Sequence, residues 1–230
     1  MKFGSITTGI ISDGLVFNMD AANRASYIPN ATSSYNTIDL SISGSFISDP
    51  TYIAPPTSAS CWQLDGVDDY INAGNPSALQ ITGDLSISGW VKTSSATQQK
   101  ILFKDDNTNR CYSVGLKSGT LVVRFGVFNG GSFTSVSSTS TIHDGDWHHL
   151  MGVFSTSTSM KIYIDGVLEA TNTTSIPSSI DNDPADFEIG RRGDGNYYWN
   201  GEIANTHIYN CTLSATEVLH NYNALKGRFA

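Results

Sequence analysis

Residues 143–170, HDGDWHHLMGVFSTSTSMKIYIDGVLEA, decide the fold of this chain. Between residues 160 and 165 the side chains Met, Ile and Ile alternate with Lys, Tyr and Asp, which is typical of an antiparallel strand with one buried face. The polar run STSTS at residues 155–159 follows an apolar run and predicts a turn before this strand. Asp165-Gly166 predicts a tight hairpin after it, because both central residues of such a turn take positive φ.

Length and composition favour one large all-β domain. A chain of 230 residues can form an undivided sandwich and is long enough to bury a sizeable core. Charged residues make up only 15%, while Gly, Ser, Thr and Asn are abundant, which is typical of many short strands joined by polar turns. The net charge of −8 repels phosphate backbones, so we expect no nucleic-acid partner. No stretch approaches the apolar length of a membrane span, so we expect no membrane insertion.

The N-terminal sequence MKFGSITTGIISDG has one Lys, no continuous apolar run and no small-residue cleavage pattern. We therefore expect no signal peptide and synthesis in a host cytoplasm, with any export by another route such as release of assembled particles by lysis. The odd number of cysteines argues against a full disulfide framework. We expect buried thiols at Cys61, Cys111 and Cys211, and a Cys61–Cys211 bridge is the alternative if their strands are neighbours.

Short apolar segments separated by turn signals recur along the rest of the chain. The predicted strands are residues 14–20, 62–65, 69–72, 85–90, 100–104, 112–116, 121–128, 187–190 and 202–209. Residues 21–60 are rich in Ser, Thr, Asn and Pro and predict loops with brief strands. This spacing is typical of a β-sandwich.

One stretch, SATEVLHNYNAL at residues 214–225, has a helical pattern. Ser214 with Glu217 three residues later forms a capping box. The side chains that can share one apolar face are Val218, Leu219, Tyr222 and Leu225. We expect a short helix over residues 214–226, ended by Gly227 and packed on the sandwich or on a partner, and an N-terminal arm over residues 1–13.

Four segments in order resemble the laminin-G-like, concanavalin A-like jelly-roll family. They are residues 14–20 with the following polar loop, WQLDGVDDYI at 62–71, Trp147-His148-His149 with Tyr163-Ile164-Asp165-Gly166, and WNGEIANTHIYNCTLS at 199–214. The resemblance spans nearly the whole chain. It implies a single domain over residues 1–230, folded as a two-sheet antiparallel jelly-roll sandwich. Members of this family mostly bind sugars or proteins and sometimes hydrolyse glycans.

The two ends, GLVFNMDAANRASY and LSATEVLHNYNALKGRFA, resemble jelly-roll proteins of tailed bacteriophages. Those proteins are virion components: capsid decorations, fibres or tail-associated adhesins. The resemblance implies a place on the virion surface, partners among the capsid or tail proteins, and an oligomer on the particle.

The carboxylates argue against an enzyme. Glycoside hydrolysis needs two positioned carboxylates, and glycanases of this family carry two Glu close together on one strand. The four Glu residues of this chain are Glu169, Glu188, Glu202 and Glu217, and none lies within four residues of another. Nothing in the sequence argues for a pair of Asp residues instead. A glycan hydrolase is therefore the least favoured interpretation.

Calcium is the metal that the sequence allows most readily. The loop at residues 65–69 supplies three carboxylates, Asp65, Asp68 and Asp69, and Ca²⁺ prefers oxygen ligands. Aspartates in turns also bond to backbone amides with no metal, so both interpretations stay open. His148 and His149 are neighbours on one strand and point to opposite faces, so we expect structural roles: one bonded inside the fold and one exposed.

Two loops offer aromatic and polar side chains for sugar binding. In the first, residues 191–199, the candidates are Arg191, Arg192, Asp194, Asn196, Tyr197 and Tyr198; in the second they are Phe128 and Asn129. The competing interpretation is that Tyr197 and Trp199 both point into the protein core while the rest of the loop is a solvated hairpin.

The leading hypothesis is a non-enzymatic bacteriophage virion protein whose loops adhere to host-surface or environmental polysaccharide. The alternative is a stand-alone, calcium-dependent lectin that recognises host glycans.

Overall fold

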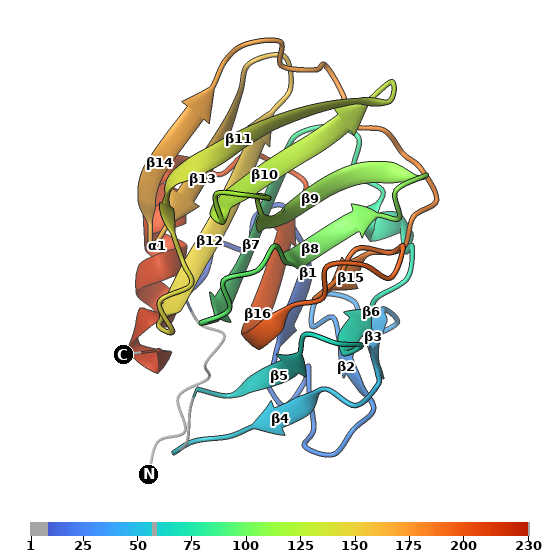
Figure 1. Cartoon of the computed structure of the whole chain (residues 1–230), viewed down its shortest axis with the longest axis vertical. Coiled ribbons are helices and arrows are strands. Elements are labelled where there is room, and N and C mark those ends of the chain that lie inside the picture. Colours follow the sequence, from blue (N-terminus) through green and yellow to red (C-terminus); the bar gives the residue numbers. More distant parts are fainter. Residues whose placement is uncertain (1–8, 57–58, 230) are drawn as a thin grey trace.

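The computed structural model describes residues 9–56 and 59–229, which form two antiparallel sheets packed face to face (Figure 1). Sheet A contains β1 (Leu15–Asp20), β4 (Thr51–Ile53), β5 (Cys61–Asp65), β7 (Leu85–Lys92), β12 (Trp147–Ser155), β13 (Ser159–Ile164), β14 (Val167–Asn172) and β16 (Asn200–Tyr209). Sheet B contains β2 (Ser33–Tyr35), β3 (Ser43–Ile47), β6 (Tyr70–Asn72), β8 (Lys100–Asp105), β9 (Arg110–Leu116), β10 (Val122–Asn129), β11 (Ser132–Thr141) and β15 (Glu188–Ile189). The predicted jelly-roll sandwich is confirmed.

Half of the strand pairings join strands that are not consecutive in the chain. Sheet A runs β14-β13-β12-β7-β16-β5-β4, with β1 also paired to β16, and sheet B runs β11-β10-β9-β8-β15-β6-β3-β2. The sheets bury a shared core between them, which includes Trp62, Phe125, Leu150 and Ile203. Each strand that contributes to this core directs alternate side chains into it, so the other set points away from the sandwich.

The hairpin that opens after β13 forms as predicted. Asp165 and Gly166 have φ of 53° and 78°, and Ile164 pairs with Val167 across the turn. The polar turn between β12 and β13 is also present, and Ser157 takes a φ of 56° within it. These two turns make β12, β13 and β14 a continuous antiparallel meander.

Helix α1 (Ala215–Leu225) covers the outer face of sheet A (Figure 1). The predicted capping box is confirmed, because the Ser214 hydroxyl accepts from the backbone of Glu217 and the Glu217 carboxylate accepts from Ser214. Val218 and Leu225 are buried against residues of sheet A that include Met151 and Cys61. The helix therefore packs on its own sandwich.

Two details of the predicted helix are wrong. Leu219 is 45% exposed and lies at the β13–β14 turn, where a Cβ added to Gly166 would be 3.0 Å from its Cδ1. Asn221 takes the buried place instead, and its amide donates to the Tyr209 hydroxyl at 3.0 Å. Gly227 does not end the helix in a left-handed conformation; it lies within a 3₁₀ turn, η2 (Lys226–Arg228).

Both ends of the described chain are fastened to this same face. The Ile11 backbone N–H donates to the Asn221 side chain at 2.8 Å. The Arg228 guanidinium donates two hydrogen bonds to Asp20 on β1, at 2.7 and 2.8 Å. Of the predicted N-terminal arm, residues 9–13 pack here and residues 1–8 lie outside the described residues. No helix in the described part of the chain has the length and hydropathy needed to span a membrane.

The Cys61–Cys211 bridge does not form, and the three cysteines make no disulfide. The Cys61 thiol lies 3.4 Å from a carboxylate oxygen of Glu202, while the Cys211 thiol donates to the Asp13 carbonyl at 3.8 Å. The two residues therefore belong to different clusters on the outer face of sheet A.

Two buried histidines lie on this covered face. His149 on β12 packs against Trp90, with ring centroids 5.4 Å apart, and neither ring nitrogen has a hydrogen-bond partner among the described residues. Burial lowers the pKa of His149 to about 3 and that of His207 to about 4. His148 differs from the expected exposed histidine, because its ring bonds to Asp165 at 2.8 Å and to Asp144 at 3.2 Å, and these contacts raise its pKa.

We predict that the free energy of unfolding falls as the pH drops from about 6.5 toward 4. The unfolded chain binds protons at His149 and His207 in this range while the folded chain does not, so each histidine contributes up to about 1.4 kcal/mol per pH unit. His148 is protonated in both states there, and its stabilising effect is lost only as the pH rises through its raised pKa.

Urea titrations between pH 4 and 7 check this, with His149→Phe expected to reduce the slope by about half. His143→Gln, which removes a histidine outside the buried pair, is the control. An unchanged slope in His149→Phe would contradict the account.

Candidate functional site

A pocket of about 160 Å³ opens on the outer face of sheet B, the side of the sandwich away from α1. Its floor is formed by β9, where Ser113 and Gly115 point outward while Tyr112, Val114 and Leu116 fill the core. The lining residues are Lys100, Phe103, Asp105, Arg110, Ser113, Gly115, Arg124, Phe128, Phe133 and Arg192. Small floor residues between large side chains make this part of the sheet concave.

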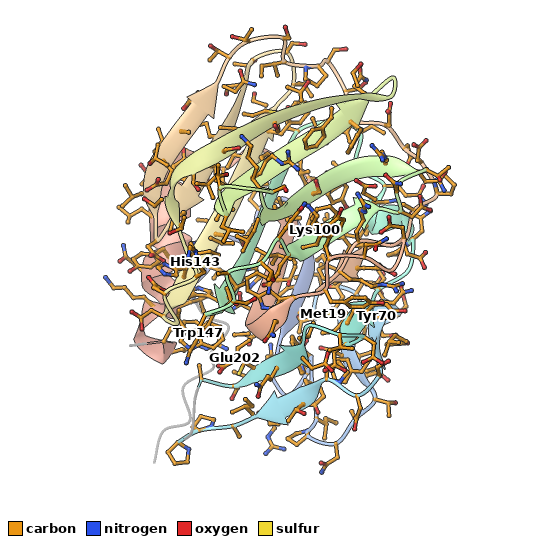
Figure 2. The ribbon with its side chains drawn as sticks, viewed as in Figure 1. Met19, Tyr70, Lys100, His143, Trp147 and Glu202 are labelled. Atoms are coloured by element: carbon orange, nitrogen blue, oxygen red, sulfur yellow. The ribbon has the colours of Figure 1, made fainter. Side chains whose placement is uncertain are left out.

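Three residues that are paired across β8, β9 and β10 form the centre of the pocket. Gly115 on β9 pairs with Lys100 on β8, which is labelled in Figure 2, and with Arg124 on β10. The two cations therefore flank the glycine on the same face. A Cβ on Gly115 would lie 2.9 Å from the Gln99 carbonyl and 3.0 Å from the Phe103 ring. Only glycine therefore fits at this position without a shift of its neighbours.

Aromatic rings form one wall. Phe128 and Phe133 have ring centroids 4.6 Å apart, and Phe133 lies over Gly126, where an added Cβ would collide with the ring. The Arg124 guanidinium lies 5.1 Å from the Phe133 centroid, and the Arg110 guanidinium lies 5.1 Å from that of Phe128. These cation–π contacts hold both guanidinium groups at the pocket edge.

Lys100 and Arg124 have no ionic partner among the described residues. Only 4% of Lys100 is exposed, yet its Nζ makes no hydrogen bond or ion pair there and lies 5.1 Å from the Phe103 ring and 5.2 Å from the Tyr197 ring. Burial, with the nearby Arg124 and Arg192 charges, lowers the pKa of Lys100 to about 8. Burial also lowers the pKa of Arg124.

The other charged residues of the pocket are already paired. Arg192 donates to Asp194 through two hydrogen bonds of 2.9 and 2.6 Å. Arg110 bonds to Asn107, and its Nε lies 3.6 Å from Asp105. Burial raises the pKa of Asp105, the carboxylate that lines the pocket, although the Asn107 N–H donates to it at 2.7 Å.

The structure brings three of the sugar-binding candidates to this pocket. Phe128 and Arg192 line it, and the Tyr197 ring lies 4.9 Å from the Arg192 guanidinium, at the pocket rim. Tyr197 is 40% exposed whereas Trp199 is fully buried, so only one of the two points into the core. Asp194 and Asn196 stabilise the loop that carries Arg192. Asp194 accepts hydrogen bonds from the Arg192 guanidinium, and Asn196 forms a β-bridge with Arg192.

The remaining candidates lie elsewhere. Arg191 bonds to Glu188 at 2.7 and 2.8 Å and lies 3.6 Å from the Tyr70 ring, and it donates to the Tyr198 hydroxyl at 3.3 Å. Asn129 donates to Ser179 at 2.9 Å and fixes the β10–β11 turn. Arg191 and Tyr198 therefore form one group and Asn129 lies apart from it, and none of the three lines the pocket.

The model of the concanavalin A-like lectin/glucanases superfamily matches residues 65–219. The chain belongs to this superfamily. A search of curated protein sequences gives no match.

Solved structures show the same concanavalin A-like fold. The binding domain of Paraclostridial Mosquitocidal Protein 1 superposes with a TM-score of 0.74 at 14% identity over 92% of this chain and 52% of that one. A botulinum neurotoxin type C structure gives 0.69 at 18% identity over 92% and 51%. Domain 4 of a GH43 extracellular arabinanase from Geobacillus stearothermophilus gives 0.65 at 18% identity over 89% and 96%. The chain thus spans about half the length of the toxin chains and nearly all of the arabinanase domain.

Several pocket residues of this concanavalin A-like domain were not identified from the sequence. They are Lys100, Phe103, Asp105, Arg110, Ser113, Gly115, Arg124 and Phe133. One signal was available in β10, where Arg124, Gly126 and Phe128 alternate with three buried apolar residues. It places an arginine and an aromatic ring on the outward face, but it does not show which residues of β8 and β9 lie beside them.

All four glutamates of the domain have structural partners. Glu188 pairs with Arg191, Glu217 caps α1, Glu169 accepts from Thr139 and Ser140, and Glu202 lies 3.8 Å from Lys92. They come from different places on the sandwich. No two of them form the carboxylate pair that glycoside hydrolysis requires.

The three aspartates of the 65–69 loop come together, each with one oxygen within 4.8 Å of the others. Asp65 Oδ1 already accepts from the backbone N–H groups of Val67, Asp68 and Asp69, at 2.8, 3.3 and 3.4 Å, and the Val67 bond lowers the Asp65 pKa. Asp69 accepts from the Asp65 N–H at 3.1 Å, and burial raises its pKa. These bonds account for the aspartates as turn residues, and a calcium ion at Asp65, Asp68 and Asp69 stays a prediction.

If the loop is held by these bonds alone, Asp65→Ala lowers the free energy of unfolding by about 1 kcal/mol, equally in calcium chloride and in EDTA. Asp68→Ala is the matched control, because the Asp68 side chain makes no hydrogen bond in the described structure, and it changes little. Thermal unfolding measures both. A calcium-dependent rise in the wild-type midpoint that both variants lose would establish a metal site instead.

Proposed function

We propose that this domain is a non-enzymatic carbohydrate-binding module whose binding site is the pocket on sheet B. The observation that carries the proposal is the combination of a concave floor, an aromatic wall and unpaired donors at one place. Sugars present apolar ring faces that pack on aromatic side chains, and hydroxyl groups that need hydrogen-bond donors and acceptors. Phe128, Phe133 and Tyr197 supply the first kind of contact, and Lys100 and Arg124 supply the second.

The neighbouring structures support a binding role. Cell entry of botulinum neurotoxin type C depends on interaction with two ganglioside molecules, and the arabinanase domain was solved in complex with arabinotriose. At 18% identity each, they do not assign a ligand to this chain. They support carbohydrate binding as the class of function, and the pocket supplies the proposed location of the binding site on this domain.

The absence of a carboxylate pair supports binding without hydrolysis. Among the described residues that line the pocket, Asp105 is the one carboxylate, and it accepts a bond from the Asn107 backbone. A glycosidase needs an acid and a second carboxylate that acts as nucleophile or base. A reducing-sugar assay on algal and bacterial polysaccharides is expected to show no product.

The finer part of the proposal places the module on the surface of a bacteriophage particle, with capsid or tail proteins as partners. It rests on the resemblance of the two chain ends to phage jelly-roll proteins. The arrangement of the sandwich is compatible with it: Ile11, α1 and Arg228 lie on the outer face of sheet A, so attachment through that face leaves the sheet B pocket accessible. Mass spectrometry of purified virions tests this; a proteome without the chain would exclude it.

Sugar binding at the pocket is tested by Phe133→Ala. Phe133 is 38% exposed, so its removal leaves the core intact while the ring beside Phe128 is lost. The affinity for any oligosaccharide found on a glycan array is expected to fall about tenfold, which is about 1.4 kcal/mol.

Tyr35→Ala is the matched control, because Tyr35 lies on β2 at the far edge of sheet B and is 43% exposed. Isothermal titration calorimetry measures both variants. An array without any bound glycan, or equal affinities for wild type and Phe133→Ala, would contradict the proposed function.

A further inference from the structure

The charge of the pocket is opposite to that of the protein. The chain carries a net charge of −8, yet its pocket is lined by Lys100, Arg110, Arg124 and Arg192 against the single carboxylate Asp105. Arg192 is neutralised by Asp194, and Arg110 is bonded to Asn107 near Asp105. Lys100 and Arg124 therefore make no ion pair with any residue that the structure describes.

Mutual repulsion and burial both disfavour the charged forms of Lys100 and Arg124. Lys100 and Arg124 flank Gly115, two strands apart, which corresponds to roughly 10 Å between their backbones. Buried charges are normally paired, yet Lys100 is 4% exposed and makes no ion pair within residues 9–56 and 59–229. An anion above Gly115 would relieve the repulsion and satisfy both cations at once.

We infer that this pocket binds the carboxylate or sulfate group of an acidic saccharide, held between Lys100 and Arg124 above Gly115. The inference rests on the proposed function and names its ligand class. The Arg124 guanidinium matches the planar, two-oxygen edge of such a group, and the Lys100 ammonium adds a compact point charge. Ser113 on the floor offers a hydroxyl, and the sugar ring packs against Phe128 and Phe133.

The size of the pocket limits what enters it. About 160 Å³ is well below the roughly 300 Å³ at the lower end of sites for drug-sized ligands. The pocket therefore accepts one charged sugar unit, while the rest of an oligosaccharide lies outside. The Tyr197 ring at the rim, beside Arg192, is placed to contact the next unit.

The experiment compares acidic sugars with neutral partners of the same skeleton, by calorimetry on the full chain. The pairs are trigalacturonate and its methyl ester, sialyllactose and its methyl ester, and galactose 6-sulfate and galactose. At least one acidic member is expected to bind at least about tenfold more tightly than its neutral partner, and the preference weakens with added salt. A preference in the galacturonate or sialyllactose pair identifies a carboxylate ligand, and a preference in the galactose 6-sulfate pair identifies a sulfate ligand.

Lys100→Met and Arg124→Gln are each expected to weaken binding of the acidic member by a larger factor than binding of its neutral partner, which removes most of the preference. Arg24→Gln is the matched control, because Arg24 is exposed in a loop outside the pocket and the variant makes the same change in net charge as Arg124→Gln. Thermal unfolding of each variant shows whether the fold is intact. If Lys100→Met is unstable, Arg124→Gln alone carries the test, because Arg124 is at a partly exposed position.

Two outcomes separate this inference from the proposed function. If acidic and neutral sugars bind equally, and each variant weakens both members of a pair by the same factor, the anionic ligand is excluded and the carbohydrate-binding module stands. If no sugar of any pair binds, and none binds on a wider array, both are overturned.

Discussion

The register of β8, β9 and β10 is the constraint on which the proposed site depends. Val114 and Phe125 point into the shared core, and their neighbours Gly115 and Arg124 must then point outward. A slip of one residue would reverse this arrangement and place Arg124 in the core, which the core packing forbids. The same packing that stabilises the sandwich therefore fixes Lys100, Gly115 and Arg124 in one row on its surface.

The two outer faces of the sandwich have different roles. The outer face of sheet A is closed by α1, η2 and residues 9–13, with Arg228 bonded to Asp20 and Asn221 bonded to Tyr209. The outer face of sheet B stays open and carries the concave floor. Because the covered face holds both ends of the described chain, the molecule has one side suited to attachment and another suited to ligand contact.

Much of the fold follows from local sequence patterns. The turn at Asp165-Gly166, the strand alternation around it and the capping box at Ser214 are short-range features, and the structure confirms each. Strand β11 was not predicted, because SFTSVSSTST is polar and only Val136 of its apolar residues is buried. Leu219 lies against the turn at Gly166, which is distant in sequence, so the helix sequence alone does not reveal this contact.

The site was predicted only in part, for a related reason. Phe128, Arg192 and Tyr197 were identified because aromatic and basic residues gather in their loops. Lys100 and Arg124 were not, because Lys100 is one of two lysines in β8 and Arg124 is the one basic residue of β10, and their meeting depends on the pairing of three strands. The separation of Arg191 from Arg192 likewise follows from Glu188, whose position in sheet B brings it to Arg191.

The most direct test of the account is to locate a bound saccharide by NMR. Backbone amide shifts of the ¹⁵N-labelled chain would be followed during titration with the tightest-binding oligosaccharide. The account predicts the largest changes at Ser113, Gly115, Arg124 and Gly126, with little change under α1 or in the 65–69 loop. Changes confined to the 65–69 loop, to the Arg191–Tyr198 group or to the α1 face, with β8–β10 unaffected, would contradict it.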